Sequence, residues 1–155
     1  LAVLTLAAAP ALAGGISGVR ILDYGPAAYD DTVLSLPQEQ TISGNMLIVA
    51  GKRILKTSTT VTAVAGSIFG VRYVVDGEPA GQEVDLAITF LSPPLMAPGT
   101  EKAVTSQTVV RKEVLGRENI IIYELESAWE AAPGEWIFVF KDGDRELARQ
   151  SFTLE

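Results

Sequence analysis

The chain has 155 residues and a net charge of −7 at pH 7, and it contains neither cysteine nor histidine. The acidic balance disfavours nucleic acid and anionic membrane surfaces as partners, because both select basic patches. Without these two residue types the chain has no disulfide, no lipid-anchored cysteine, no Ser-His-Asp or Cys-His machinery and no histidine-based metal site, which disfavours an enzyme.

The first thirteen residues, LAVLTLAAAPALA, form an uncharged apolar segment. The segment is too short for a membrane-spanning helix, which needs about 20 residues. It ends in Ala11-Leu12-Ala13, a small-x-small pattern typical of signal-peptidase cleavage. We therefore predict a signal peptide cleaved after Ala13, whose basic start lies upstream of Leu1; a buried helix is the alternative. Residues 14–155 are then predicted to form one domain, periplasmic or secreted, with no lipid anchor and no membrane insertion.

The first predicted strand covers residues 19–24 (VRILDY), where apolar and polar residues alternate. Residues 25–45 contain several Pro, Gly and Asp breakers and are predicted to be irregular, with a short strand around residues 32–36. Residues 46–62 are rich in β-branched residues, and Gly51-Lys52 is predicted as a turn within them.

The two clearest strands cover residues 67–76 (SIFGVRYVVD) and 83–91 (EVDLAITFL). In each, every second residue is apolar, which is the period of a half-buried strand. The predicted core faces are Phe69, Val71, Tyr73 and Val75 in the first strand, and Val84, Leu86, Ile88 and Phe90 in the second. The short connection GEPAGQ between them predicts an antiparallel hairpin.

Two prolines follow the second of these strands, and Pro93-Pro94 with Pro98-Gly99 predict a rigid, extended loop. Residues 104–114 are then predicted as a polar-rich strand at a sheet edge or on a solvent face. Residues 119–125 (NIIIYEL) are predicted as a buried strand.

The last predicted strands cover residues 135–141 and 146–154, and Asp142-Gly143 between them is a strong hairpin signal. The mature part therefore contains about seven to nine short strands with Pro and Gly turns and no convincing helix. This pattern favours an all-β sandwich of two sheets, with a closed barrel as the alternative.

Three segments resemble a small bacterial family, the domain of unknown function 3859: residues 59–86, Pro93-Pro94-Leu95, and residues 132–155. The resemblance runs from about Val19 to the C-terminus, without an alignment for residues 25–58, and is most specific at F-G-V-R-Y, G-E-W-x-F and the terminal Q-S-F. It implies an immunoglobulin-like antiparallel β-sandwich, often behind a signal peptide. It implies no activity, cofactor or catalytic residue.

Paired carboxylates are the remaining candidates for chemistry, because they can serve a glycosidase or bind a hard metal ion. The pairs are Asp30-Asp31, Asp142 with Asp144, and Glu124 with Glu126. No calcium-loop pattern surrounds Asp30-Asp31. The second pair is better explained by turn formation, and the third by solvent-facing charges on one side of a strand. We therefore predict no catalytic residue, no metal ligand and no cofactor.

The aromatic residues suggest where a partner would bind. Trp136, Phe138 and Phe140 share one strand face and are predicted to lie in the core. Trp129 lies between strands, beside Glu126 and Glu130, and is predicted to be partly exposed. Leu95 and Met96, on the stiff Pro-rich loop, are the other predicted contact residues.

The leading functional hypothesis is a non-catalytic binding or accessory module of the bacterial cell envelope. Its partner would be a protein or glycan that contacts loops, through Leu95, Met96 and Trp129, or a sheet edge. The alternatives are a carboxylate-dependent hydrolase of an envelope glycan and a structural or assembly protein.

Overall fold

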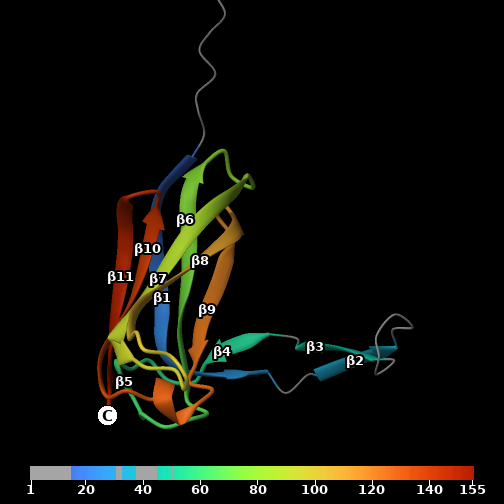
Figure 1. Cartoon of the computed structure of the whole chain (residues 1–155). Coiled ribbons are helices and arrows are strands. Elements are labelled where there is room, and N and C mark those ends of the chain that lie inside the picture. The colour runs from blue at the N-terminus through green and yellow to red at the C-terminus, as the bar shows by residue number, and fades with distance from the viewer. Residues whose placement is uncertain (1–14, 31–32, 38–44, 50) are drawn as a thin grey trace, which may run out of the picture.

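Strands account for most of the described chain, and the longest is β1 (Gly15–Tyr29) (Figure 1). The computed structural model describes residues 15–30, 33–37, 45–49 and 51–155, so the predicted signal peptide lies outside the described residues. The other strands are β2 (Val33–Pro37), β3 (Asn45–Val49), β4 (Lys52–Ile54), β5 (Thr60–Val61), β6 (Ile68–Glu78), β7 (Glu83–Leu95), β8 (Val104–Val114), β9 (Glu118–Glu124), β10 (Gly134–Asp142) and β11 (Arg145–Leu154). A short 3₁₀ turn, η1 (Ala128–Glu130), connects β9 to β10.

Two sheets form the sandwich, as the strand pattern predicts. One has the order β4-β1-β6-β9 and the other the order β5-β11-β10-β7-β8. Their pairings are antiparallel, except that the short β5 runs parallel to β11. Figure 1 shows β1, β6 and β9 behind the layer that contains β7, β10 and β11. The all-β sandwich prediction is confirmed.

The predicted hairpin between residues 67–76 and 83–91 is wrong. These residues belong to β6 and β7, which lie in different sheets, so the short connection between them crosses from one sheet to the other. The reason is that both strands carry an apolar face of similar size. When β6 and β7 lie in different sheets, their apolar faces pack against each other across the core and both are buried. If the two strands paired within one sheet, both faces would lie on the same side, and a second sheet would be needed to cover them.

The end of β1 pairs with β4, and the two strands between them in the chain, β2 and β3, pair with each other. Tyr29 pairs with Lys52 in the β1–β4 ladder, and Val33 pairs with Val49 in the β2–β3 ladder. Between the ladders the Asp30 N–H donates to the Gly51 carbonyl at 3.0 Å. Because β3 pairs with β2 and β4 pairs with β1, Gly51-Lys52 does not connect a hairpin of β3 and β4. In Figure 1 β2 and β3 lie to the side of the sandwich.

Aromatic side chains from both sheets fill the core. The Phe69 ring, on β6, lies 5.7 Å from that of Trp136, 5.4 Å from that of Phe138 and 5.1 Å from that of Phe152. Tyr73 packs at 4.9 Å on Phe140 in the same way. The predicted core faces of β6, β7 and β10 are confirmed, since all their members are buried except the half-buried Val84.

The predicted Pro-rich loop begins later than expected, because β7 continues through Pro93 and Pro94 to Leu95. A proline has no N–H to donate to a ladder. Accordingly, the ladder between β7 and β8 is interrupted after Leu91 and resumes where Leu95 pairs with Val104. The prolines therefore lie in an extended strand end, and Leu95 belongs to the sheet.

The predicted hairpin of β10 and β11 is confirmed. Asp142 pairs with Arg145, which leaves a turn of Gly143 and Asp144. Gly143 has φ +58°, a conformation that glycine adopts without steric cost. The Asp142 carboxylate accepts a hydrogen bond from Arg145 at 3.2 Å and so closes the turn.

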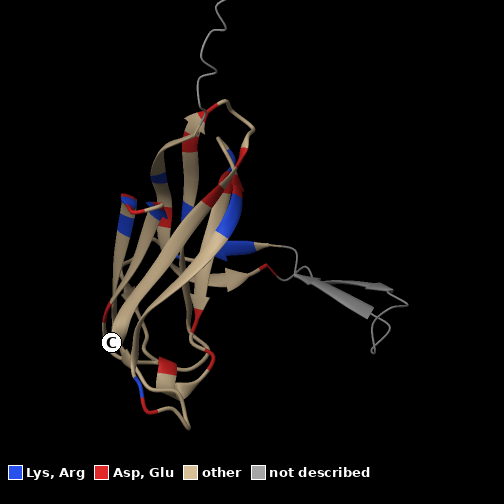
Figure 2. Ribbon diagram, turned by 45° about the horizontal axis from the view of Figure 1, so that its top comes forward, with Lys and Arg blue, Asp and Glu red and all other residues tan. Residues whose placement is uncertain are grey.

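Charged residues of both signs are interspersed along the strands of the two sheets (Figure 2). Several pair across neighbouring strands, such as Arg20 with Asp76 at 2.6 Å and Lys112 with Asp85 at 3.0 Å. Figure 2 also shows acidic segments at the end of β9 and in the turn that follows it, and this region contains the candidate site.

Candidate functional site

The 3₁₀ turn η1 holds Trp129 at a fixed position at one end of the sandwich. The Glu130 N–H donates to the Ser127 carbonyl at 3.0 Å, and the Ala131 N–H donates to the Ala128 carbonyl at 3.2 Å. The turn is also tied to the core, because the buried Trp136 indole donates from Nε1 to the Ala132 carbonyl at 3.0 Å. Trp129 itself remains 38% exposed, as the sequence predicts.

A cavity of about 510 Å³ lies on one side of Trp129, and we call it the acidic cavity. Its wall includes three carboxylates from β9 and from the segment after it. Two tyrosines also line it, one from β1 and one from β9. These lining residues are Glu124, Glu126, Glu130, Tyr29 and Tyr123.

Hydrogen bonds hold several groups in this wall. The Tyr29 hydroxyl donates to Oε2 of Glu124 at 3.1 Å. The Gln107 amide, from β8, donates from Nε2 to the Tyr123 hydroxyl at 3.0 Å. Glu130 is only 9% exposed. Within residues 15–30 and 51–155, none of the ion pairs includes any of the three glutamates that line the cavity.

Burial is the largest cause of each pKa shift in the wall of the acidic cavity. Burial raises the pKa of the Glu130 carboxyl, and the charges of Glu126 and Glu124 raise it further. Burial also raises the pKa values of the Tyr29 and Tyr123 hydroxyls, and neighbouring glutamates add to both shifts. Negative charge is therefore concentrated and incompletely solvated at this end of the cavity.

Lys52 also lines the acidic cavity but does not neutralise it. Burial lowers the pKa of its ammonium group, and the nearby Arg111 guanidinium lowers it further. No ion pair joins Lys52 to another described residue. The lining of the acidic cavity thus contains three glutamates and Lys52, which forms no ion pair with them.

A second cavity, of about 220 Å³, is also lined by Trp129, and we call it the apolar cavity. Its apolar lining residues include Leu95, Ala97 and Val104, from the end of β7, the following loop and the start of β8. Trp129 and Gln107 line both cavities. The two cavities are therefore adjacent parts of one surface.

The three predicted contact residues have different positions. Leu95 is 1% exposed, so the prediction that it lies on an exposed loop is wrong: its side chain is part of the core, beneath the apolar cavity. Met96 is exposed, and it lines neither cavity. Trp129 is the predicted contact residue that lies at both cavities.

The predicted carboxylate pairs are distributed over the molecule. Asp30 forms an ion pair with Arg53 at 3.4 Å, while Asp31 lies outside the described residues. The β9 strand ends at Glu124, so Glu124 and Glu126 are not alternate residues of one strand as predicted, although both line the acidic cavity. The described residues contain no cluster of three or more Asp or Glu side chains placed to hold a metal ion, and no helix among them is long and apolar enough to cross a membrane.

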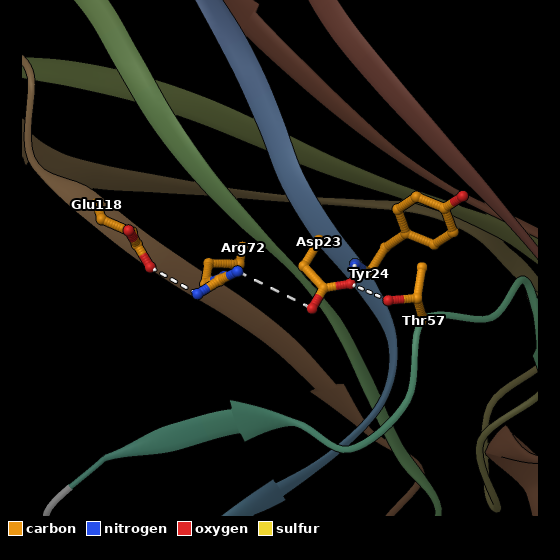
Figure 3. Close-up of polar contacts among 5 residues, drawn as sticks. All are labelled: Asp23, Tyr24, Thr57, Arg72 and Glu118. Carbon is orange, nitrogen blue, oxygen red and sulfur yellow. Dashed lines mark hydrogen bonds and ion pairs between the residues drawn. The ribbon is translucent and has the colours of Figure 1, made fainter.

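A second group of polar residues lies on the β4-β1-β6-β9 sheet and has a structural role (Figure 3). Asp23, beside a bulge in β1, accepts hydrogen bonds from the Tyr24 N–H at 2.8 Å and from the Thr57 hydroxyl at 2.6 Å. Arg72 lies 4.0 Å from Asp23 and donates to Glu118 at 3.0 Å. Each charge in this group has a partner, so the group connects β1, β6, β9 and the loop after β4.

Comparison with known proteins agrees with this architecture. No curated protein matches the chain. A solved immunoglobulin-like protein from Pseudomonas aeruginosa is similar in structure, with a TM-score of 0.61, 27% sequence identity, and coverage of 88% of this chain and 96% of that one. The model of the family described as domain of unknown function (DUF3859) matches residues 19–154. The chain therefore belongs to the DUF3859 family and has the immunoglobulin-like fold that the resemblance implies.

Proposed function

We propose that this domain is a non-catalytic binding module of the bacterial cell envelope, and that its partner contacts the surface around Trp129. One observation carries the proposal: Trp129 is 38% exposed and lines two adjoining cavities. Tryptophan is among the residues enriched in binding hot spots, and binding sites are concave. The envelope location rests on the signal-like segment, residues 1–13.

The rigidity of η1 supports a binding role for Trp129. Hydrogen bonds within the turn and from Trp136 to Ala132 fix the main chain that carries Trp129 before a partner arrives. A segment that is already ordered loses less conformational entropy on binding. Met96 is also exposed but lines neither of these two cavities, so we expect it to contribute less.

Site-specific crosslinking in intact cells tests this function. A photoreactive amino acid at position 128, where Ala128 is exposed beside Trp129 and the substitution keeps the indole, should capture a discrete partner. The same residue at position 22, where Leu22 on β1 is 40% exposed, is the matched control and should capture none. Identical products from both positions, or none from either, would exclude a partner at the Trp129 surface.

The envelope location has its own test, because the native chain has no cysteine. A single cysteine introduced at Asp144, which is exposed in the β10–β11 turn, provides one reactive thiol. A membrane-impermeant maleimide should label it once the outer membrane is permeabilised. Labelling only after complete lysis would place the protein in the cytoplasm.

A hydrolase acting on an envelope glycan is the second candidate function, and the acidic cavity favours it at a different place from Asp30-Asp31. Burial raises the pKa of Glu130, as a general acid requires, and Glu126 and the aromatic wall lie nearby. The purified chain should then release products from cell-wall glycans, and Glu130→Gln should not. Absence of turnover on such substrates would leave the binding function alone.

A further inference from the structure

No ion pair joins the carboxylates of the acidic cavity to a described basic residue, although Lys52 lines the same cavity. Glu130 is nine-tenths buried and lines the cavity. Glu124 accepts from the neutral Tyr29 hydroxyl. A buried carboxylate without a cationic partner is costly, and a cation that enters the cavity recovers part of that cost.

Aromatic rings complete the environment that a cation requires. Trp129, Tyr29 and Tyr123 line the same cavity as the three glutamates. The face of an aromatic ring attracts an ammonium or guanidinium group, and tryptophan does so most strongly. Carboxylates and rings together therefore select an organic cation over an anion or a neutral sugar.

The apolar cavity indicates what is attached to that cation. It adjoins the acidic cavity through Trp129 and Gln107, and Leu95, Ala97 and Val104 provide an apolar lining. A small free cation would leave this second cavity empty. A polypeptide fills both, because every second side chain of an extended chain points to the same face, about 6.6 Å further along, and can enter an adjoining recess.

We propose that the acidic cavity binds a lysine or arginine side chain of a protein partner and that the apolar cavity receives a nearby apolar side chain of the same segment. This inference rests on the proposed binding function and specifies the chemistry of the partner. Lys102 lines the apolar cavity, and its positive charge would repel a basic side chain placed there. The reverse arrangement, with the basic side chain in the apolar cavity, is therefore disfavoured.

Selection from random heptapeptides displayed on phage, with the immobilised full chain as bait, tests the pairing. We expect enriched sequences in which Lys or Arg lies within two positions of an apolar residue. Selection against Trp129→Ala defines the background. Enrichment without a basic residue, or none above this background, overturns the inference; if position 128 still crosslinks a partner in cells, the proposed function stands.

Charge variants separate a specific site from general attraction to an acidic protein. The triple variant E124Q/E126Q/E130Q should weaken binding of a selected peptide about tenfold or more. Its control is E78Q/E83Q/E135Q, which removes the same charge from exposed positions that line neither cavity and should change affinity less than about twofold. Equal losses in both triple variants overturn the proposed site.

Two further variants keep the test independent of folding. Glu126 is exposed, so Glu126→Gln alone should weaken binding without disturbing the fold. Ala97→Asp in the apolar cavity should remove the preference for the apolar residue but keep that for the basic one. The Trp136 indole N–H signal, from a buried and hydrogen-bonded group, reports whether each variant is folded.

A competition experiment distinguishes a peptide from a free cation. Lysinamide or putrescine, added at the concentration of a selected peptide, should not displace it, because neither can occupy the apolar cavity. Displacement as effective as that by the unlabelled peptide identifies a small organic cation as the ligand and overturns the peptide assignment.

Discussion

The Tyr73 hydroxyl donates a hydrogen bond of 2.5 Å to the Glu113 carboxylate, and this contact joins the two sheets. Tyr73 lies on β6 and Glu113 on β8, and both side chains are buried. Arg111 lies 3.2 Å from the same carboxylate oxygen and donates to the Ile120 carbonyl of β9 at 2.9 Å. Burial and the bond to Glu113 raise the pKa of Tyr73, so its hydroxyl remains protonated and a donor. This polar connection closes the sandwich where β8 and β9 form the edges of their sheets.

Replacing Tyr73 by phenylalanine should therefore destabilise the fold. The Glu113 carboxylate would stay buried and keep only its contact with Arg111, so we expect the free energy of unfolding to fall by about 1–3 kcal/mol. Urea unfolding measures this change. Tyr29→Phe is the control, because it removes a similar bond to Glu124 from an exposed hydroxyl and should cost less than about 1 kcal/mol. Equal losses of unfolding free energy in the two variants would show that burial of the Tyr73–Glu113 hydrogen bond does not increase its contribution to stability.

Gly70 is required by the close approach of β6 and β9, where it pairs with Ile122. A Cβ atom at this position would lie 2.2 Å from the Ile121 carbonyl oxygen, and a main-chain atom cannot move aside without breaking the ladder. We expect Gly70→Ala to lower the free energy of unfolding by about 2 kcal/mol or more.

Gly18 on β1 provides the comparison for Gly70. A Cβ atom there meets no atom within 4 Å, and its φ is not positive. Gly18→Ala should therefore be neutral or stabilise by up to about 1 kcal/mol, since it restricts the unfolded chain. A large loss in Gly18→Ala, measured under the same conditions, would contradict the steric explanation.

Leu95 and Met96 are neighbours in the chain with opposite surroundings. Leu95 belongs to the core cluster, so Leu95→Ala should lower the free energy of unfolding by about 2–5 kcal/mol. Met96 is 48% exposed, and Met96→Ala should change it by less than about 0.5 kcal/mol. Thermal and urea unfolding of the two variants decide the point. Similar stabilities would mean that Leu95 is not packed in the core.

The raised pKa of Glu130 predicts how its ionisation affects stability. Burial raises this pKa above the ordinary 4.5, so the folded chain binds the proton more tightly than the unfolded chain. The resulting stabilisation is complete below the pKa of the unfolded chain and is lost as pH rises through the raised pKa. Glu130→Gln should thus be more stable than the native chain at neutral pH, and the difference should shrink as pH falls. Urea midpoints measured across this range test the sign.

Glu146 provides the opposite case for the same measurement. Its hydrogen bond with Arg149 lowers its pKa below the ordinary 4.5. The stability that it contributes is present above the pKa of the unfolded chain and is lost as pH falls through the lowered pKa. Glu146→Gln should therefore be less stable at neutral pH, with the difference disappearing in acid. The same sign in both Gln variants would contradict the assigned causes.

Alternation of apolar and polar residues was sufficient to predict most strands and their core faces. The face of β6 that carries Phe69 and Tyr73 and the face of β10 that carries Trp136 and Phe138 follow directly from the period of two. The alternation pattern, however, predicts which side chains of a strand are buried but not which strands pair with it. Main-chain hydrogen bonds are the same for any pair of strands, so the assignment of β6 and β7 to different sheets required the tertiary structure.

The candidate site was predictable only at the position of Trp129. A tryptophan among glutamates between two strands indicates partial exposure, and the structure places it at the two cavities. The cavity walls combine residues as distant in sequence as Tyr29, Gln107 and Glu130, and no local pattern encodes that meeting. Leu95 was misplaced for a related reason: prolines predict a loop locally, but pairing with Val104 keeps β7 in the sheet.

By itself, the sequence determined the β class of this protein, the buried faces of its main strands and its resemblance to a family, because these depend on local periodicity and on local motifs. The tertiary structure decided which strands share a sheet, which hydrophobic residues remain exposed and where negative charge gathers. These properties depend on packing between segments distant in the chain, since burial and charge density belong to the assembled surface and not to any one strand.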